Sequence, residues 1–503
     1  MNKKRGVRRP GGRQVRKRRS RGAILVWFAL MLTVLLGMVG LVVDVGLMMG
    51  THRQVQNAAD AAALAVAMNL LYGSNASPVD TATTYVRNHN GLADAETPVV
   101  HIPPASGAYV GVAGFVEVIV TSPVQTLFIQ FLPGVGDTHN VTARAVAGGE
   151  AVTSGDGVAV LNPYVTGLTV GGQATLEVNG TVIDNSEGKG LDADGNPVGT
   201  GENYYAGRAG SNSPAYASKF HIVGGVDWPA NFRNFDRDSV DKVLYCGQLP
   251  VPDPLLNLPT PTTNSGVVNI SRGSPSSTNT NMSPGIDAGG ENRVVTQFTS
   301  DDPDLFGGLP YLKLHPGIYT SIEITGGQVF FVPGIYVIKP APNVQTAMKV
   351  TGGTVLAKGI MIYNTGHNYV PETGNPDATD KDLKPPHIDG AEFAAITLNS
   401  SIVMEPIDTK KYDYGGKKVS DFDGMLFYQR RRNTAGLDIQ GNASEGHLAG
   451  TLYAKWAHVK LAGQGTYDAQ FVVGSMEVTG SGVVTIKYAG TNLGKAPQIF
   501  LVE

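Results

Sequence analysis

The chain has 503 residues, enough for two or three domains that each bury a core. Only 16 % of the residues are charged, whereas there are 64 glycines and 30 prolines, which is typical of many short strands joined by tight turns. The net charge is −3, but the first 21 residues hold eleven lysines and arginines and no acid. Subtracting these eleven leaves 28 basic against 42 acidic residues, or −14, so a basic tail precedes a mildly acidic body. The single cysteine, Cys246, excludes an internal disulfide framework and a cysteine-based zinc site within one chain.

An apolar, uncharged segment follows the basic tail at residues 22–43, "GAILVWFALMLTVLLGMVGLVV". At about 1.5 Å per residue, a helix of this length spans roughly 33 Å, enough for a hydrocarbon core of about 30 Å. Because the positive charges come first, we expect a single-pass helix in the inner (cytoplasmic) membrane, with residues 1–21 cytoplasmic and the rest outside. A twin-arginine or other cleaved export signal is the alternative, but the run is long and no small-x-small site follows it directly.

The basic tail has a simple role in this topology. Lysine and arginine beside a membrane fix the orientation of the helix and attract anionic lipid. We therefore expect the membrane, and not nucleic acid, to be the partner of residues 1–21.

The helical pattern continues past Val43 through the alanine-rich stretch "QNAADAAALAVAMNLL" at residues 56–71. There is no proline, and the first plausible end is Gly73. Alanine favours helix and leaves a small, smooth face that can pack closely on a sheet or another helix. Gly46 and Gly50 form a G-x-x-x-G pair, a weakly specific pattern for helix association.

Residues 21–70 resemble the N-terminal segment of TadG-like proteins of the Flp (Tad) pilus-assembly group. These have a basic leader, an apolar span, a "Gly-Leu-Val-Val-Asp-Val-Gly" element and then "Gln-Asn-Ala-Ala-Asp-Ala-Ala-Ala-Leu-Ala". The resemblance implies a membrane anchor whose partners are pilus-assembly or other envelope proteins. The matching positions are Gly40, Asp44, Gly46, Arg53, Gln56, Asn57, Ala58, Ala59, Asp60, Ala61, Ala62, Ala63, Leu64 and Ala65. We predict that membrane and helix packing involves Gly37, Gly40, Asp44, Gly46, Gly50, Gln56, Asn57, Ala58, Asp60 and Ala61.

The resemblance extends to a small α+β module at residues 73–150, with a short helix that ends at Asn90–Gly91. It also separates this chain from two relatives. Prepilin-type subunits need a glutamate as the fifth residue after the cleaved glycine, and if Gly22 were that glycine, the fifth residue would be Trp27. The nearest approach to a von Willebrand A metal site is at residues 184–188, "DNSEG", which lacks the second serine.

Residues 151–503 repeat one phrase, alternating apolar residues around a glycine pair and then an apolar strand, as in "IEITGGQVFFVPGIYVI" and "MKVTGGTVLAKGIMIY". Recurrence at roughly 17 to 26 residues predicts a stacked β-solenoid. The body resembles the right-handed parallel β-helix regions that follow some TadG-like anchors; a β-sandwich is the alternative. We expect the 73–150 module to cap the start of the stack and "GKAPQIFLVE" to cap its end.

Two stretches interrupt the repeat, at about residues 247–290 and 367–390. The first is rich in Pro, Ser, Thr and Asn and is predicted to be a long exposed excursion. The second is predicted to project from one coil as a loop. Insertions of this kind often form the binding surface of a solenoid.

Two acidic clusters are weak candidates for a Ca²⁺ site or a pair of glycosidase carboxylates. Aspartate beside proline and glycine is more often ordinary turn chemistry, so we predict no metal site. The clusters are Asp301, Asp302 and Asp304, and Asp377, Asp380 and Asp382.

Other candidate residues do not form a recognisable catalytic motif. Arg430, Arg431 and Arg432 are expected on a solvated edge or loop, because three consecutive strand residues cannot share a face. His367 and His387 flank the second interruption and are expected to be exposed, and Cys246 to be a structural or idle thiol. The sequence contains no nucleophile elbow, zinc-protease or phosphate-loop pattern, so we predict no catalytic residue and no cofactor.

Two functions remain open. The first is a membrane-anchored structural or adhesive envelope protein associated with Tad-type pilus assembly, whose β-helix presents a surface, for example to a polysaccharide. The alternative is an anchored polysaccharide lyase or hydrolase on the same scaffold. The ligand and the oligomeric state are not predicted.

Overall fold

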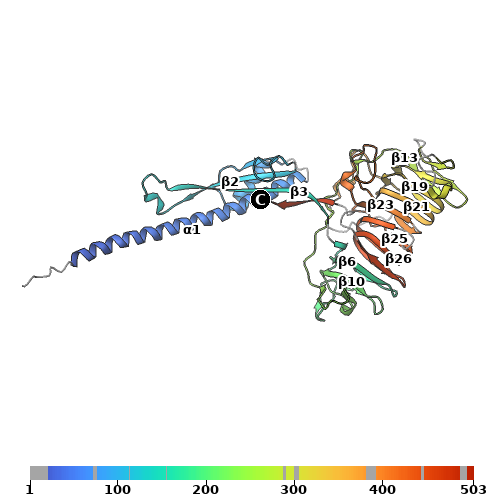
Figure 1. The fold of residues 1–503 in the computed structure, drawn as a ribbon, viewed down its shortest axis with the longest axis horizontal. Helices are drawn as coiled ribbons and strands as arrows, with labels where there is room; N and C mark the ends of the chain where they lie inside the picture. Colours follow the sequence, from blue (N-terminus) through green and yellow to red (C-terminus); the bar gives the residue numbers. More distant parts are fainter. Residues whose placement is uncertain are drawn as a thin grey trace, which may run out of the picture. The chain divides into compact units, whose positions relative to one another are not determined.

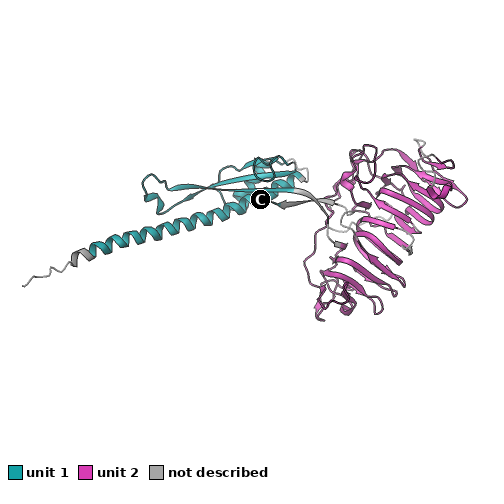
Figure 2. Cartoon of the chain, viewed as in Figure 1, with its two compact units in different colours: residues 1–150, 498–503 teal, residues 151–497 magenta. Residues whose placement is uncertain are grey.

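The computed structural model describes residues 21–71, 76–112, 114–153, 156–286, 291–298, 305–380, 392–400, 402–442, 447–487 and 495–502. The chain divides into two compact units, residues 1–150 with 498–503, and residues 151–497 (Figure 2). An N-terminal apolar helix is followed by a mostly-β body, as the coarse pattern of the sequence predicts.

Unit 1 is built on one long helix, α1 (Arg21–Leu71), which continues without a break from the apolar segment through the alanine-rich stretch. It is long and apolar enough to cross a membrane. A short helix α2 (Pro78–Thr84) follows, capped by the Ser77 hydroxyl and continued by the π-turn η1 (Tyr85–His89). These elements end at Asn90, where the sequence predicts the end of a helix.

Four strands form the sheet of unit 1, in the order β1 (Val99–His101), β2 (Phe115–Gln125), β3 (Thr138–Thr153) and β28 (Lys495–Leu501). Strands β2 and β3 form a long antiparallel hairpin whose tip carries the 3₁₀ turn η2 (Ile129–Phe131) (Figure 1). The expectation that the C-terminal segment caps the solenoid is wrong. Strand β28 lies beside β3 and adds an edge strand to unit 1.

Unit 2 consists of short strands joined by turns and 3₁₀ helices. Its first strands are β4 (Asp156–Val160), β5 (Leu168–Val170), β6 (Thr175–Asp184), β7 (Gly190–Leu191), β8 (Pro197–Val198), β9 (Gly207–Ala209), β10 (Ala215–Ile222), β11 (Phe232–Asn234) and β12 (Leu244–Tyr245). The middle strands are β13 (Ser271–Gly273), β14 (Ser276–Ser277), β15 (Met282–Ser283), β16 (Arg293–Val295), β17 (Tyr311–Leu314), β18 (Gly317–Tyr319), β19 (Ile322–Phe331) and β20 (Gly334–Ile338). The last are β21 (Thr346–Asn364), β22 (Ala395–Asn399), β23 (Ile402–Pro406), β24 (Met425–Gln429), β25 (Leu437–Asn442), β26 (His447–Thr479) and β27 (Val483–Ile486).

The 3₁₀ helices of unit 2 are η3 (Pro229–Asn231), η4 (Thr263–Ser265), η5 (Leu305–Gly308), η6 (Asp377–Thr379) and η7 (Ser420–Phe422).

Most of these strands pair in parallel, and the repeated sequence phrases lie directly on one another. In the β19–β21 ladder, Ile322 pairs with Met348 and Val329 with Val355, so "IEITGGQVFF" stacks on "MKVTGGTVLA". Alternate side chains point inward and form one apolar core of Val, Ile, Leu, Ala and Phe. Burial of these side chains is the main stabilising term of the body.

The strands do not stack in chain order. Strands β4, β5 and β6 pair with β26 and β27 on one side, and β5 and β6 pair with β9 and β10 on the other. Figure 1 shows the resulting order of labelled strands, from β13 through β19, β21, β23, β25 and β26 to β6 and β10. The first strands of the body therefore have neighbours on both sides, so the expectation of an open first coil that needs a cap is wrong.

The chain between β12 and β13 returns to the far end of this stack and is not the exposed excursion predicted at 247–290. Leu255, Leu258 and Val267 are almost fully buried and join a second apolar cluster with outward-facing residues of the ladders, among them Tyr428. Residues 287–290 lie outside the described part of the chain. The composition of residues 247–290 predicts an exposed loop, but leucines within this segment pack against the body.

Candidate functional site

The alanine-rich half of α1 packs on the sheet of unit 1. Ala58, Ala59, Ala62 and Ala63 have no exposed surface and contact valines and alanines of β2 and β3. Small side chains on both surfaces let the helix axis approach the sheet closely. The helix and the sheet can therefore bury their facing surfaces with small side chains alone.

The other predicted packing residues of this half have mixed surroundings. The Gln56 side chain donates to the Arg144 carbonyl (3.0 Å) and to Asp60 Oδ1 (2.7 Å), so it ties the helix to β3. Ala61 is half-buried and Asn57 is exposed. These two side chains are left available on the helix surface.

Asp44 joins α1 to the tip of the β2–β3 hairpin. Its Oδ1 accepts the amide of Leu127 (2.8 Å), and its Oδ2 accepts the amides of Phe128 (2.8 Å) and Ile129 (2.6 Å). These amides open the turn η2 and have no partner within it, so the buried carboxylate caps the turn. The sequence singled out Asp44 but not its partners.

Gly40 lies one turn before Asp44 and makes room for Phe128. A Cβ atom at Gly40 would lie 2.6 Å from the Phe128 ring, well inside contact distance. A Cβ atom at Gly37, Gly46 or Gly50 would meet open space, so the G-x-x-x-G pair is not used inside this unit. Its use in association with another helix stays a prediction.

Glu117 is a buried carboxylate that ties the loop after β1 onto the sheet. It accepts hydrogen bonds from Arg144 (2.5 Å), the Ala105 amide (3.0 Å), His101 (2.8 Å) and the Ser106 hydroxyl. Burial alone would raise the pKa of Glu117, but these donors outweigh it and lower the pKa to about 2. The group is a structural clamp and not a proton donor at neutral pH.

In unit 2, the candidate acids of the second interruption surround an arginine. Arg430 Nε lies 2.9 Å from Asp377 and 2.6 Å from Asp380, and its Nη1 lies 3.0 Å from Glu392. Arg430 and Arg431 are each 3 % exposed, so their predicted place on a solvated edge is wrong. They follow β24 in a turn, which lets consecutive side chains point in different directions.

The second interruption folds back onto the body as far as it is described. Asp377 and Asp380 are buried, whereas His367 is exposed as expected. Asp377 also accepts from the hydroxyls of Tyr363 (2.5 Å) and Thr365, and burial raises its pKa to about 6 despite Arg430. Asp382 and His387, and the first acidic cluster Asp301, Asp302 and Asp304, lie outside the described residues.

Arg431 holds the returning chain segment against the body. Its Nη2 donates to the carbonyls of Leu255 (3.1 Å) and Leu258 (2.7 Å), and its Nε donates to the Tyr453 hydroxyl (3.2 Å). Asp253 beside them accepts from Tyr453 (2.7 Å). Both buried arginines therefore join loops to the ladders, and within the described ranges no group of three or more His, Cys, Asp or Glu is arranged to hold a metal.

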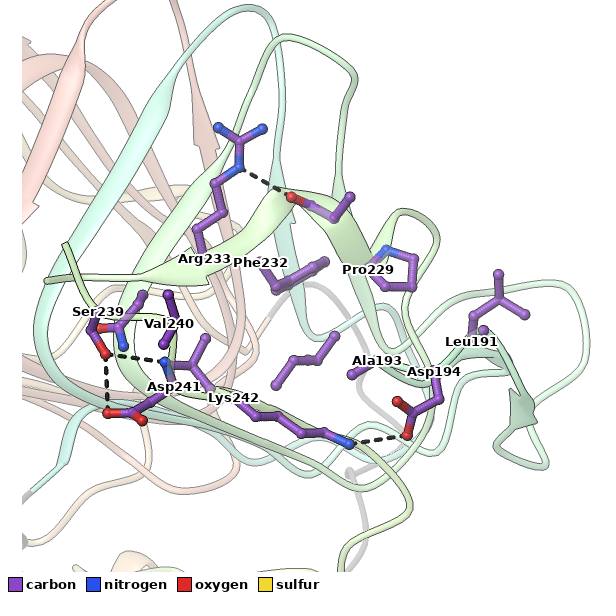
Figure 3. Close-up of a pocket in the computed structure, with 15 residues that line it drawn as sticks. Leu191, Ala193, Asp194, Pro229, Phe232, Arg233, Ser239, Val240, Asp241 and Lys242 are labelled. Carbon is purple, nitrogen blue, oxygen red and sulfur yellow. Dashed lines mark hydrogen bonds and ion pairs between the residues drawn. The ribbon is translucent and has the colours of Figure 1, made fainter. Parts of the chain in front are cut away.

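An open hollow of about 660 Å³ lies near the β10–β12 end of the stack (Figure 3). Lys242 and Asp194 form an ion pair across it at 3.1 Å, and Arg233 donates to the Ala230 carbonyl at 3.0 Å. These polar groups pair with one another at the surface and do not converge on one point in the hollow. Cys246 nearby is half-buried, and burial raises the pKa of its thiol to about 12, so it is not a nucleophile at neutral pH.

Cations stack on aromatic rings along the same end of the stack. Arg237 lies 4.6 Å from the Tyr216 ring centre, Lys219 lies 5.2 Å from Tyr245, and Arg208 lies 6.0 Å from Tyr205. We call this group the aromatic–cation strip. Sequence reasoning missed it because its members come from separate strands and turns, and only the parallel pairing of β10 with β12 brings Lys219 beside Tyr245.

Comparison with known proteins identifies one part of the chain. Residues 22–69 match the family model described as "Putative Flp pilus-assembly TadE/G-like". No curated protein and no solved structure matches. The TadE/G-like segment coincides with most of α1, including Gly40, Asp44 and the buried alanines, and it confirms the resemblance found in the sequence.

The TadE/G-like segment therefore contains both the apolar span and the packing face. Side chains of residues 25–39 are exposed, whereas the segment from Val55 to Ala67 buries one face on the sheet. This division is what a single-pass anchor requires, with one half of the helix for lipid and the other for its own domain.

Proposed function

We propose that this chain is a single-pass protein of the inner (cytoplasmic) membrane, with residues 1–21 in the cytoplasm and both units beyond the membrane on the outer side. The eleven cations before the apolar span support this orientation, because positive charge is retained on the cytoplasmic side. The large exposed side chains of residues 25–39 support a lipid environment for this part of α1.

We infer that unit 2 is a right-handed parallel β-helix. The parallel ladders with a constant offset between repeated phrases support a solenoid, since a sandwich of antiparallel sheets gives no reason for such pairing. The right hand follows the general preference for right-handed connections between parallel strands.

The proposed role is that of a structural or adhesive envelope protein associated with Flp/Tad-type pilus assembly. The TadE/G-like segment within α1 is the observation that carries this proposal. Within the aromatic–cation strip, the exposed Lys219 beside the Tyr245 ring supports a binding surface for anionic polysaccharide, because an aromatic face and an exposed cation complement a sugar ring and its carboxylate. Arg237 is paired with Glu177 at 2.5 Å and adds its aromatic neighbour Tyr216 rather than a free charge.

The enzymatic alternative, a polysaccharide lyase or hydrolase, has less support. Asp377 and Asp380 are buried and paired with Arg430, so neither is presented to a glycosidic bond. We propose a non-catalytic body. Activity on a polyuronate panel that is lost when both aspartates are changed to asparagine would reverse this ranking.

Topology is tested by reporter fusions after Glu150. Alkaline phosphatase should be active there, and green fluorescent protein exported through the same pathway should be dark. The same fusions placed before Gly22 are the control and should give the opposite pattern. Active fluorescent protein after Glu150 would remove the anchor proposal.

The pilus association is tested by deleting the gene in its source cell and restoring it with the full chain. Pilus display or surface attachment should fall in the deletion strain and recover with the full chain. Restoration with a chain carrying Tyr216→Ala and Tyr245→Ala should recover display but not attachment to polysaccharide. Normal piliation and attachment in the deletion strain would contradict the proposal.

A further inference from the structure

The tip of the β2–β3 hairpin is unusually apolar for a loop outside the core. Residues 127–135 read "LFIQFLPGV", and four large side chains are exposed: Leu127 (55 %), Phe128 (46 %), Phe131 (80 %) and Leu132 (53 %). A contiguous exposed apolar group of this kind on a turn marks an interaction site.

This tip lies beside the apolar span of α1 and not beside its alanine-rich half (Figure 1). An apolar groove of about 550 Å³ separates the two and is lined by Thr33, Val34, Leu36, Gly37, Met38, Leu41, Phe128, Ile129, Phe131 and Leu132. Thr33 precedes Asp44 by eleven residues, or roughly 16 Å along the helix at about 1.5 Å per residue. The tip thus reaches back alongside the uncharged stretch that is long enough to cross a bilayer.

Two features of α1 fix the tip in this place. The three hydrogen bonds from the 127–129 amides to Asp44 hold the turn at the end of the apolar span. The absent side chain at Gly40 lets Phe128 lie directly on the helix. The tip is therefore positioned by the helix and is not a loose loop.

The backbone of the tip is suited to a medium without water. Besides the three amides bound by Asp44, the amide of Phe131 donates to Phe128 (3.1 Å), that of Leu132 to Ile129 (3.0 Å) and that of Val135 to Leu132 (3.2 Å). Pro133 has no amide hydrogen. In hydrocarbon each unsatisfied backbone group costs several kcal/mol, so the pairing of these six amides lowers the cost of insertion.

Polar residues resume at the base of the tip. The Thr126 amide donates to the Asp137 carbonyl (2.8 Å) and closes the loop, and the exposed Asp137 and half-exposed His139 follow it. Asp44 caps the loop from the helix side. This change from apolar to polar at one level is typical of a membrane boundary.

We propose that residues 127–135 insert into the hydrocarbon of the outer leaflet beside α1 and form a second membrane contact of unit 1, which we call the anchor module. The occupant of the exposed apolar surface is lipid acyl chain, because the surface is continuous with the lipid-facing side chains of residues 25–39. Two contacts hold the module at a fixed depth, whereas a single helix would let it tilt and rotate. This inference rests on the proposed placement of α1 in a bilayer.

The test uses the full chain in phospholipid vesicles, with single cysteines placed in a Cys246→Ser background. Phe131→Cys probes the tip, and Leu132→Cys is a second tip position in case the first disturbs folding. Leu36→Cys reports on α1, and Val110→Cys is the matched control, an exposed apolar residue in the loop at the far end of the same hairpin. Each carries an environment-sensitive fluorophore, and quenching is measured with lipids brominated on their acyl chains and with aqueous iodide.

The tip labels should be quenched by brominated lipid as strongly as the Leu36 label and protected from iodide, whereas the Val110 label should show the reverse. Tip labels that behave like Val110, while Leu36 reports lipid, overturn the insertion and leave the anchor intact. Tip labels shielded from both quenchers show a protein partner in place of lipid and also overturn it. If the Leu36 label itself is quenched by iodide and not by lipid, the proposed membrane anchor fails.

Discussion

The anchor module and the body bury carboxylates with opposite results. Glu117 in the module accepts from a cation, Arg144, and from His101, Ser106 and an amide, and its pKa falls to about 2. Asp184 in the body accepts from the amides of Ser186 (3.0 Å) and Leu168 (3.1 Å), and burial raises its pKa to about 7 despite these two donors. Burial raises the pKa of both groups; the donors of Glu117 outweigh this effect, whereas the two amides of Asp184 do not.

The two regions also build their cores differently. The module packs alanines of α1 against alanines and valines of the sheet, whereas the body stacks larger residues, with tyrosines 363, 428 and 453 in contact across successive ladders. A small-residue interface depends on close approach, and a large-residue stack depends on buried area. The two cores should therefore lose stability under different kinds of substitution.

The largest loss of stability is expected in the body when the buried cation Arg430 is removed. Arg430→Gln leaves Asp377 and Asp380 without their cation and should lower the unfolding free energy of the body by about 3–5 kcal/mol. Urea unfolding followed by tryptophan fluorescence, to which the buried Trp456 contributes, measures this change. Arg432→Gln is the matched control at a half-buried neighbour and should cost well under 1 kcal/mol; equal losses would contradict a specific role of Arg430.

A smaller effect is expected in the module from added volume. Ala62→Leu places a larger side chain in the fully buried helix–sheet contact and should cost about 1–3 kcal/mol. Ala61→Leu, on the half-buried side of the same turn, should cost much less. Hydrogen exchange of the β2 and β3 amides measures both, and a harmless Ala62→Leu would mean that the helix does not pack closely.

The sequence predicts the anchor better than the body for physical reasons. The span, the continuous helix and the packing face follow from hydropathy, alanine propensity and one family pattern, all of which are local. Asp44 could be named, but its partners lie 83 to 85 residues away and no periodicity connects them.

In the body, alternation and turns predict strands but not which strands pair. Any two alternating strands fit one another, so the pairing of β6 with β27 could not be found from the sequence. The burial of Arg430 was missed because an arginine is normally solvated, and its acids come from a loop far along the chain. Neither Gln429 before Arg430 nor the turn after it indicates from the sequence that the Arg430 side chain is buried.

The link between helix and hairpin tip should respond to a single methyl group. Gly40→Ala brings a Cβ into the Phe128 ring and should destabilise the tip by about 1 kcal/mol, at the low end for overpacking because the half-exposed ring can shift. Exchange of the 127–129 amides should become faster. Gly46→Ala, where the space is open, is the control and should leave those amides unchanged.

The two regions should respond to pH in opposite directions, and this is the sharpest contrast between them. For Glu117 the unfolded chain binds a proton below about 4.5 and the folded module only below about 2, so module stability rises with pH across this window and is lost as pH falls through it. For Asp184 the folded body binds a proton below about 7 and the unfolded chain only below 3.8, so body stability falls as pH rises from about 4 to 7. Each group contributes at most about 1.4 kcal/mol per pH unit.

Hydrogen exchange resolved by unit separates these two responses. Glu117→Gln should flatten the rise of module stability between about pH 2 and 4.5 and leave the body unchanged. Asp184→Asn should reduce the fall of body stability between about pH 4 and 7 and leave the module unchanged. Part of the body's slope should persist in Asp184→Asn, because burial also raises the pKa of Asp377, to about 6. If both variants changed the two units equally, the carboxylates would not act locally. If Asp184→Asn left the pH dependence of body stability between about pH 4 and 7 unchanged, the buried aspartate would be ionised in the folded body, and the contrast with Glu117 would be wrong.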